Sequence, residues 1–102
     1  MVINIITGNK FPQKKLLSET NIFFNSPKRS SLITSRSSPY IIKIGKKSIK
    51  ILLSRQCEKD DYHKIKTFIK TIFNGTSILI VSNEDIHWLD DIDNVKIDTL
   101  HI

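Results

Sequence analysis

The sequence predicts one compact α/β domain, with an α+β arrangement as the alternative, and three observations support this prediction. An amphipathic helix is expected over about residues 57–74. Two apolar strands are expected at residues 40–44 and 49–53, and a third at residues 77–82, whose four central residues are all apolar. We therefore expect a small mixed sheet of about four to six strands, together with one long helix and one or two short helices.

The helix over residues 57–74 shows the period of a single helical face. Its large apolar residues recur at three- and four-residue steps, which line up on one side of an α-helix. Acids in the first turn suit the positive end of the helix dipole, and Gly75 suits a left-handed C-terminal cap. The apolar residues are Tyr62, Ile65, Phe68, Ile69, Ile72 and Phe73, and the acids are Glu58, Asp60 and Asp61.

Residues 40–44 and 49–53 predict a β-hairpin across the turn Gly45–Ser48. In the natural register three apolar pairs share one face, and Lys43 lies directly opposite Lys50 on the other face. Like charges in that position are destabilising by a few tenths of a kcal/mol. A lysine-rich ribbon can lie along a phosphate backbone, but lysines also protect an exposed edge strand from aggregation, and both explanations stay open. The apolar pairs are Tyr40 with Leu53, Ile42 with Ile51, and Ile44 with Ile49.

The remaining segments predict two more strands and two short helices. Residues 2–7 are apolar and β-branched, and residues 94–102 alternate apolar and polar side chains, as a half-exposed edge strand does. Residues 13–19 and 84–91 favour short helices. Residues 21–24 favour a short strand or an anchor for two Phe side chains.

The strand at residues 77–82 is expected to lie centrally in the sheet. Ile78 to Val81 are four consecutive apolar residues, and a strand that is apolar on both sides is usually buried on both faces. The long helix would cover one face, and the two short helices, the second of them capped by Asn83, would cover the other. The strand–helix–strand unit over residues 49–81 predicts a right-handed crossover, so its two strands should be parallel.

Length and composition favour one domain over residues 1–102, since 39% of the residues are apolar. No stretch approaches the roughly 18–20 apolar residues of a membrane span. Residues 1–7 lack a basic leader, and the single Cys57 cannot form an internal disulfide. We expect a cytoplasmic protein that does not contact membranes. The Ile-, Lys- and Asn-rich, Ala-free composition resembles that of an AT-rich gene, which would fit a phage, plasmid or other mobile element.

The charge is distributed unevenly along the chain. The net charge is +6, but residues 1–56 hold eleven Lys and Arg against one acid, whereas residues 57–102 hold five Lys against nine acids. This split predicts an anion-binding first half, although chance and Lys-rich codons would also produce it. Residues 25–39 predict a flexible, basic, Ser-rich loop. It would either present Lys28, Arg29 and Arg36 to an anion or remain an ordinary surface loop.

No pattern predicts a metal site, a cofactor site or a catalytic centre. Six acids and His87 lie within residues 84–98, but their spacing fits neither a calcium loop nor a helical His pair, so an acidic solvated face is favoured. Cys57 at the start of the long helix could have a thiol pKa lowered by the helix dipole, and His63 or His87 could act as its base. Such residues occur in most proteins, however, and their proximity in sequence does not indicate a catalytic geometry.

The leading functional hypothesis is non-catalytic, sequence-tolerant binding to nucleic acid through the basic hairpin and loop. The residues expected to bind the anionic partner are Lys28, Arg29, Arg36, Lys43, Lys46, Lys47 and Lys50. The basic stripe on the long helix is expected to be an ordinary solvated face, although it could extend this surface if the hairpin binds a polyanion; it consists of Lys59, His63, Lys64, Lys66 and Lys70. Tyr40 is the only aromatic residue expected near the surface for base stacking.

Two alternatives belong to other classes. The first is a small inhibitor or accessory subunit whose basic half docks on an acidic protein surface of a nucleic-acid-handling complex. In that case the edge strand at residues 95–100 could pair with a partner's sheet or with a second copy. The second is a small ribonuclease toxin, with Arg36, Tyr40, Arg55 and His63 as the candidate residues.

Overall fold

The computed structural model describes residues 1–26, 30–34 and 39–101 and confirms the predicted mixed α/β class. One six-stranded sheet packs against two α-helices, and two short 3-10 helices lie in the connections. The strands are β1 Val2–Ile6, β2 Leu32–Ile33, β3 Tyr40–Ile44, β4 Ser48–Leu53, β5 Ser77–Ser82 and β6 Lys96–His101. The helices are α1 Gln13–Phe23 and α2 Lys59–Ile72, and the 3-10 helices are η1 Gly8–Lys10 and η2 His87–Leu89.

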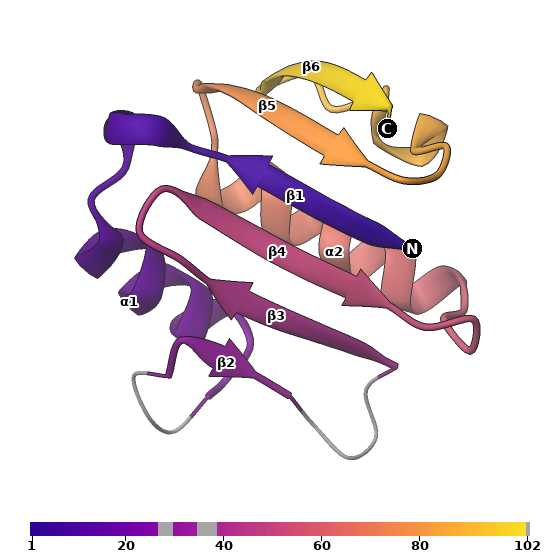
Figure 1. Ribbon diagram of the computed structural model, residues 1–102, viewed down its shortest axis with the longest axis horizontal. Helices are drawn as coiled ribbons and strands as arrows, with labels where there is room; N and C mark the ends of the chain where they lie inside the picture. The colour runs from indigo at the N-terminus through magenta and orange to yellow at the C-terminus, as the bar shows by residue number, and fades with distance from the viewer. Residues whose placement is uncertain (27–29, 35–38, 102) are drawn as a thin grey trace.

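The strand order in the sheet is β2-β3-β4-β1-β5-β6, which Figure 1 shows from bottom to top. All neighbouring strands are antiparallel except β5 and β6, which are parallel. Because β4 and β5 are both antiparallel to β1, they run parallel to each other with β1 between them, as the strand–helix–strand unit predicts. β6 lies at one edge of the sheet, also as predicted.

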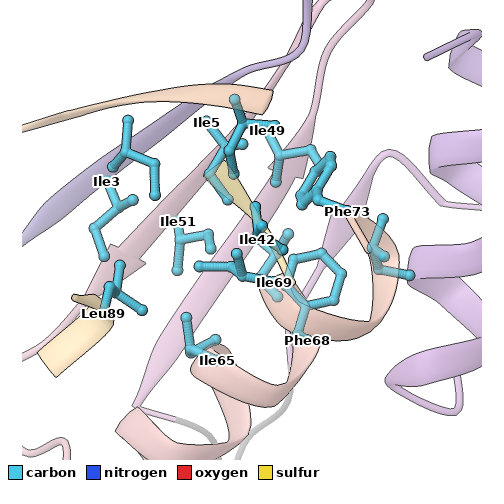
Figure 2. Close-up of a cluster of buried hydrophobic side chains, with 14 of the residues drawn as sticks. Ile3, Ile5, Ile42, Ile49, Ile51, Ile65, Phe68, Ile69, Phe73 and Leu89 are labelled. Atoms are coloured by element: carbon cyan, nitrogen blue, oxygen red, sulfur yellow. The ribbon is translucent and has the colours of Figure 1, made fainter. Parts of the chain in front are cut away.

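Both α-helices lie on the same side of the sheet, behind the strands in the view of Figure 1. The apolar face of α2, formed by Ile65, Phe68, Ile69 and Ile72, is buried as its periodicity predicts. Figure 2 shows Ile65, Phe68 and Ile69 facing a layer of isoleucines from the strands. The fully buried isoleucines on the strands are Ile3, Ile5, Ile42, Ile49, Ile51 and Ile80. The molecule therefore has two layers, with its core between sheet and helices.

The start and the end of α2 show the chemistry expected from the sequence. Glu58 is the N-cap and forms a capping box with Asp61, whose side chain accepts a hydrogen bond from the Glu58 backbone N–H at 2.8 Å. Asp60 also lies in the first turn. Past the C-terminus, Gly75 has φ +73°, the left-handed conformation that glycine tolerates best. These local signals explain why the helix was predictable.

The expectation that β5 is buried on both faces is wrong. Ile78 and Ile80 are buried beneath the helices, but Leu79 on the other side is 36% exposed. The second cover is missing because α1, like η2, packs against α2 on the already covered side. The described part of the chain places no helix on the opposite face of the sheet.

Two of the expected short elements also differ from their predictions. The helix predicted at residues 13–19 continues to Phe23, so the strand considered at residues 21–24 is wrong, whereas the anchor is confirmed because Phe23 and Phe24 pack against the core. The segment at residues 84–91 forms only the 3-10 turn η2, although Ile86 and Leu89 are buried. Asn83 does not cap a helix, since its side-chain oxygen accepts a hydrogen bond from the Val2 backbone at 2.8 Å.

Part of the predicted Ser-rich loop carries the short strand β2. Ile33 is buried, and the Ser31 carbonyl accepts a hydrogen bond from the backbone N–H of Ile44 at 2.7 Å. The buried Asn21 holds the segment from the other side, because its amide donates to the Ser30 carbonyl at 3.0 Å and accepts from the Ser30 N–H at 3.2 Å. Leu32 and Ile33 are therefore part of the sheet, and contacts of Ser30 and Ser31 hold the segment in place.

Candidate functional site

The face of the sheet that points away from α1 and α2 is the candidate site, and we call it the open face. Successive side chains of a strand point to opposite faces, so the pairing registers identify its residues. One row crosses the sheet, from Leu32 on β2 through Lys43, Lys50, Asn4 and Val81 to Leu100 on β6. The other open-face residues are Val2, Ile6, Ile41, Ser48, Leu52, Ser77, Leu79, Lys96 and Asp98.

The β3–β4 hairpin has the predicted register, and it brings four lysines together. Lys43 lies directly opposite Lys50 on the open face, and both side chains are exposed. Lys46 and Lys47 are exposed in the turn, which is fixed to the end of β1 because the Lys47 carbonyl accepts a hydrogen bond from the Thr7 N–H at 2.9 Å. We call these four residues the lysine cluster.

Edge protection does not explain the lysine cluster. β3 pairs with both β2 and β4, and β4 pairs with both β3 and β1, so neither strand of the hairpin is an edge. Lysines discourage aggregation where a strand exposes unpaired backbone groups, but Lys43 lies where β3 pairs with β2, and Lys50 lies where β4 pairs with β1. This interpretation of the hairpin is therefore wrong.

The acids of the second half of the chain do not neutralise the lysine cluster. Among the residues that the structure describes, none of the four ammonium groups pairs with a carboxylate. Asp98 is the acid on the open face, and it lies on β6, three strands from β4, or about 14 Å at the usual strand spacing. At that distance salt largely screens an exposed charge, since the Debye length is about 10 Å at 0.1 M.

The other basic residues expected at the site are not brought to it. Lys28, Arg29 and Arg36 lie outside the described residues. The stripe on α2, from Lys59 to Lys70, lies on the opposite side of the sheet, and Lys66 within it forms an ion pair with Asp91. The stripe therefore does not extend the open face, and the solvated helix face that the sequence favoured is the interpretation that agrees with the structure.

The open face is aliphatic and carries no aromatic ring. Tyr40, expected near the surface, is only 6% exposed and packs on the helix side against Phe24, with ring centroids 6.0 Å apart. All five Phe, both Tyr and the single Trp belong to the core beneath the helices or pack against it. The sequence did not predict the open face. It showed that β5 is apolar on both sides, but it did not show that one side of the sheet lacks a helix.

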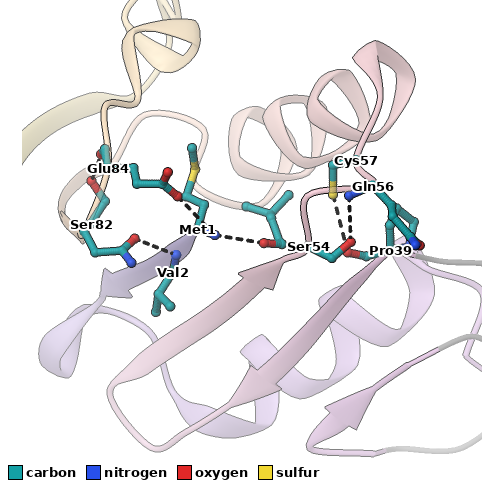
Figure 3. Close-up of polar contacts among 10 residues, drawn as sticks. Met1, Val2, Pro39, Ser54, Gln56, Cys57, Ser82 and Glu84 are labelled. Atoms are coloured by element: carbon teal, nitrogen blue, oxygen red, sulfur yellow. Dashed lines mark hydrogen bonds and ion pairs between the residues drawn. The ribbon is translucent and has the colours of Figure 1, made fainter.

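The surroundings of Cys57 do not activate a nucleophile. Burial, and then the negative charge of Asp61, raise the pKa of the Cys57 thiol, so the expected lowering by the helix dipole is wrong. Figure 3 shows the thiol beside the Pro39 carbonyl, to which it donates a hydrogen bond at 3.4 Å. The amino group of Met1 donates to the Leu53 carbonyl at 2.9 Å and pairs at 3.1 Å with Glu84, which lies beside it in Figure 3. These contacts join segments that are distant in the sequence, and none of them activates the Cys57 thiol.

His87 is exposed and lies between two carboxylates. Its Nδ1 is 2.7 Å from an Asp90 oxygen, and its Nε2 is 3.2 Å from an Asp85 oxygen. The hydrogen bond to Asp90, followed by the charge of Asp85, raises the pKa of the imidazole above its ordinary value. No group of three or more His, Cys, Asp or Glu side chains within the described ranges is placed to hold a metal ion.

Asp90→Asn is expected to lower the pKa of His87 toward its ordinary value, because it removes the first of these interactions. His87 stabilises the fold fully below its unfolded-state pKa, and this contribution is lost as pH rises through its higher folded-state pKa. The variant should therefore show a weaker pH dependence of unfolding across that window. An NMR titration of the imidazole protons measures the pKa, with Asp93→Asn as the control because Asp93 does not contact His87. An unchanged pKa in Asp90→Asn would contradict the assignment.

No family model, no curated protein and no solved structure matches this chain. The described helices include none with the length and apolar character needed to cross a membrane. The fold and the site together define a two-layer α/β protein whose open sheet face is aliphatic and carries a lysine cluster on its central hairpin.

Proposed function

We propose that the protein binds nucleic acid through the lysine cluster, without sequence preference and without catalysis. The observation that carries the proposal is the Lys43–Lys50 pair, two ammonium groups held opposite each other on central strands with no carboxylate partner among the described residues. Like charges held this way repel each other, and a phosphate between them would turn the repulsion into attraction. Lys46 and Lys47 at the adjacent turn would contact neighbouring phosphates.

The chemistry of the surface also favours binding without sequence preference. Lysine is a flexible point charge without the rigid, planar fork of arginine, so it suits the neutralisation of phosphates. Aromatic rings that would stack on unpaired bases are absent from the open face. Contacts of this kind are made with the sugar–phosphate backbone, whose geometry is common to all sequences.

A salt titration tests the proposal. Fluorescence anisotropy would follow binding of the full chain to a random-sequence duplex and to a single strand of equal length. If four phosphates are neutralised, the slope of log affinity against log salt should be near −3.6 for the duplex, so affinity should fall about a hundredfold between about 50 and 200 mM salt. Absence of any binding at about 50 mM salt would refute the proposal.

We also propose a cellular location and a genetic origin for the protein. A cytoplasmic location is supported by Cys57, which is free. A phage or other mobile-element origin is supported by the Ala-free, Ile- and Lys-rich composition. The ribonuclease hypothesis gains no support from the geometry, since Tyr40 is buried and His63 lies on α2, across the sheet from the lysine cluster.

A further inference from the structure

Most of the open face is apolar, and this is unusual for a sheet surface left to solvent. An antiparallel sheet with one free face normally places polar residues on that face. Here Val2, Leu52 and Val81 are half-buried on it, and five larger side chains are more exposed. These are Ile6 at 41%, Leu32 at 47%, Ile41 at 37%, Leu79 at 36% and Leu100 at 55%. Exposed apolar patches of this kind mark sites of association.

The apolar residues on the open face of β5 favour burial under a second layer, which the described part of the chain does not provide. β5 is apolar on both sides, a pattern typical of strands buried on both faces. α1 and α2 both lie on the other side of the sheet. A second apolar layer supplied from outside would complete a three-layer arrangement, the usual way to bury a sheet on both faces.

The charges on the open face indicate what that outside layer carries. Lys43, Lys50 and Lys96 lie on it against one acid, Asp98. A second copy laid face to face would bury these lysines against like charges, which is costly. A nucleic acid would find no ring to stack on and would leave the aliphatic side chains uncovered. Charge complementarity therefore favours a protein surface that is apolar along its centre and carries carboxylates opposite Lys43 and Lys50.

We propose that the open face docks an acidic, amphipathic α-helix of a partner protein. Its apolar stripe would cover Ile6, Leu79 and Leu100, and its carboxylates would pair with Lys43 and Lys50. A helix fits because its backbone is already satisfied, whereas an added strand would need a free sheet edge, and the open face is not one. This function goes beyond nucleic-acid binding, and the two occupants would compete because they share two lysines.

Two synthetic helical peptides test the proposal against the full chain. Both carry the same leucine stripe, one flanked by Glu and the other by Lys, and methyl NMR follows the titration. The acidic peptide should shift the methyl signals of Leu79, Leu100 and Ile41, whereas those of Ile3 and Ile51, which are fully buried under the helices, should stay unchanged. The basic peptide should bind at least about tenfold more weakly.

Variants separate this proposal from nucleic-acid binding. Leu79→Thr combined with Leu100→Thr should weaken the acidic peptide at least about tenfold and leave binding to the duplex unchanged. Lys46→Ser combined with Lys47→Ser should weaken binding to the duplex and leave binding to the acidic peptide unchanged. Ile22→Thr is the matched control, because it removes an apolar side chain that is 73% exposed on α1, away from the open face. Circular dichroism confirms that each variant is folded.

Three results would overturn the docking proposal without touching the nucleic-acid proposal. One is equal affinity for the acidic and basic peptides, and another is a titration in which the open-face methyl signals do not move. The third is self-association of the free chain that protects Leu79 and Leu100, because the occupant would then be a second copy.

Discussion

Phe68→Ala is expected to destabilise the fold by about 3–5 kcal/mol, the usual cost of removing a fully buried phenyl ring. Phe68 is 0% exposed and lies where α2 meets α1. Its ring centroid is 5.4 Å from that of Phe23, 5.0 Å from that of Phe24 and 6.5 Å from that of Phe73. The change would therefore leave a cavity and also remove aromatic pairs worth about 0.5–1.5 kcal/mol each. Since a domain is stable by only about 5–15 kcal/mol, a large part of its stability would be lost.

Urea denaturation followed by circular dichroism measures this loss. The matched control is Ile22→Ala, which removes an exposed side chain from α1 and should change the free energy of unfolding by less than about 0.5 kcal/mol. The loss in the free energy of unfolding for Phe68→Leu should lie between those of the other two variants, because leucine keeps most of the buried volume. A loss below about 1 kcal/mol in Phe68→Ala would show that this ring is not at the centre of the core.

The elements that the sequence predicted well are those specified by neighbouring residues. α2 has an apolar face, acids in its first turn and Gly75 beyond its end, all within one short segment. The hairpin register follows from alternation across a short turn, and so Lys43 was correctly placed opposite Lys50. Such signals need no knowledge of the rest of the chain.

The errors concern contacts between residues distant in sequence. β1 inserts between β4 and β5, and this makes the hairpin central and excludes edge protection. The last turn of α1 is linked to a distant segment by Asn21, whose side chain bonds Ser30 beyond the helix end. The apolar pattern of β5 indicates that burial of both its faces is favourable, but it does not indicate on which side of the sheet the helices pack. The open face was therefore not predictable from local periodicity.

Changing the whole lysine cluster, Lys43, Lys46, Lys47 and Lys50, to serine is expected to abolish detectable nucleic-acid binding. Four phosphate contacts would be lost, so the slope of log affinity against log salt should approach zero, and affinity at about 50 mM salt should fall by more than about a hundredfold. The fold should survive, because all four side chains are exposed and have no carboxylate partner in the described residues. Removing the repulsion between Lys43 and Lys50 should even stabilise it by a few tenths of a kcal/mol.

The control for this variant must remove the same charge from elsewhere. Lys14 on α1 and Lys59, Lys64 and Lys70 on α2 are four exposed lysines on the helix side of the molecule. Changing these four to serine lowers the net charge equally, but it should leave most of the affinity and most of the salt dependence in place, because the phosphate contacts on the hairpin remain. Anisotropy titrations of both variants against the same duplex provide the comparison. If the two variants lose affinity to the same extent, binding depends on overall charge, and the lysine cluster is not the site.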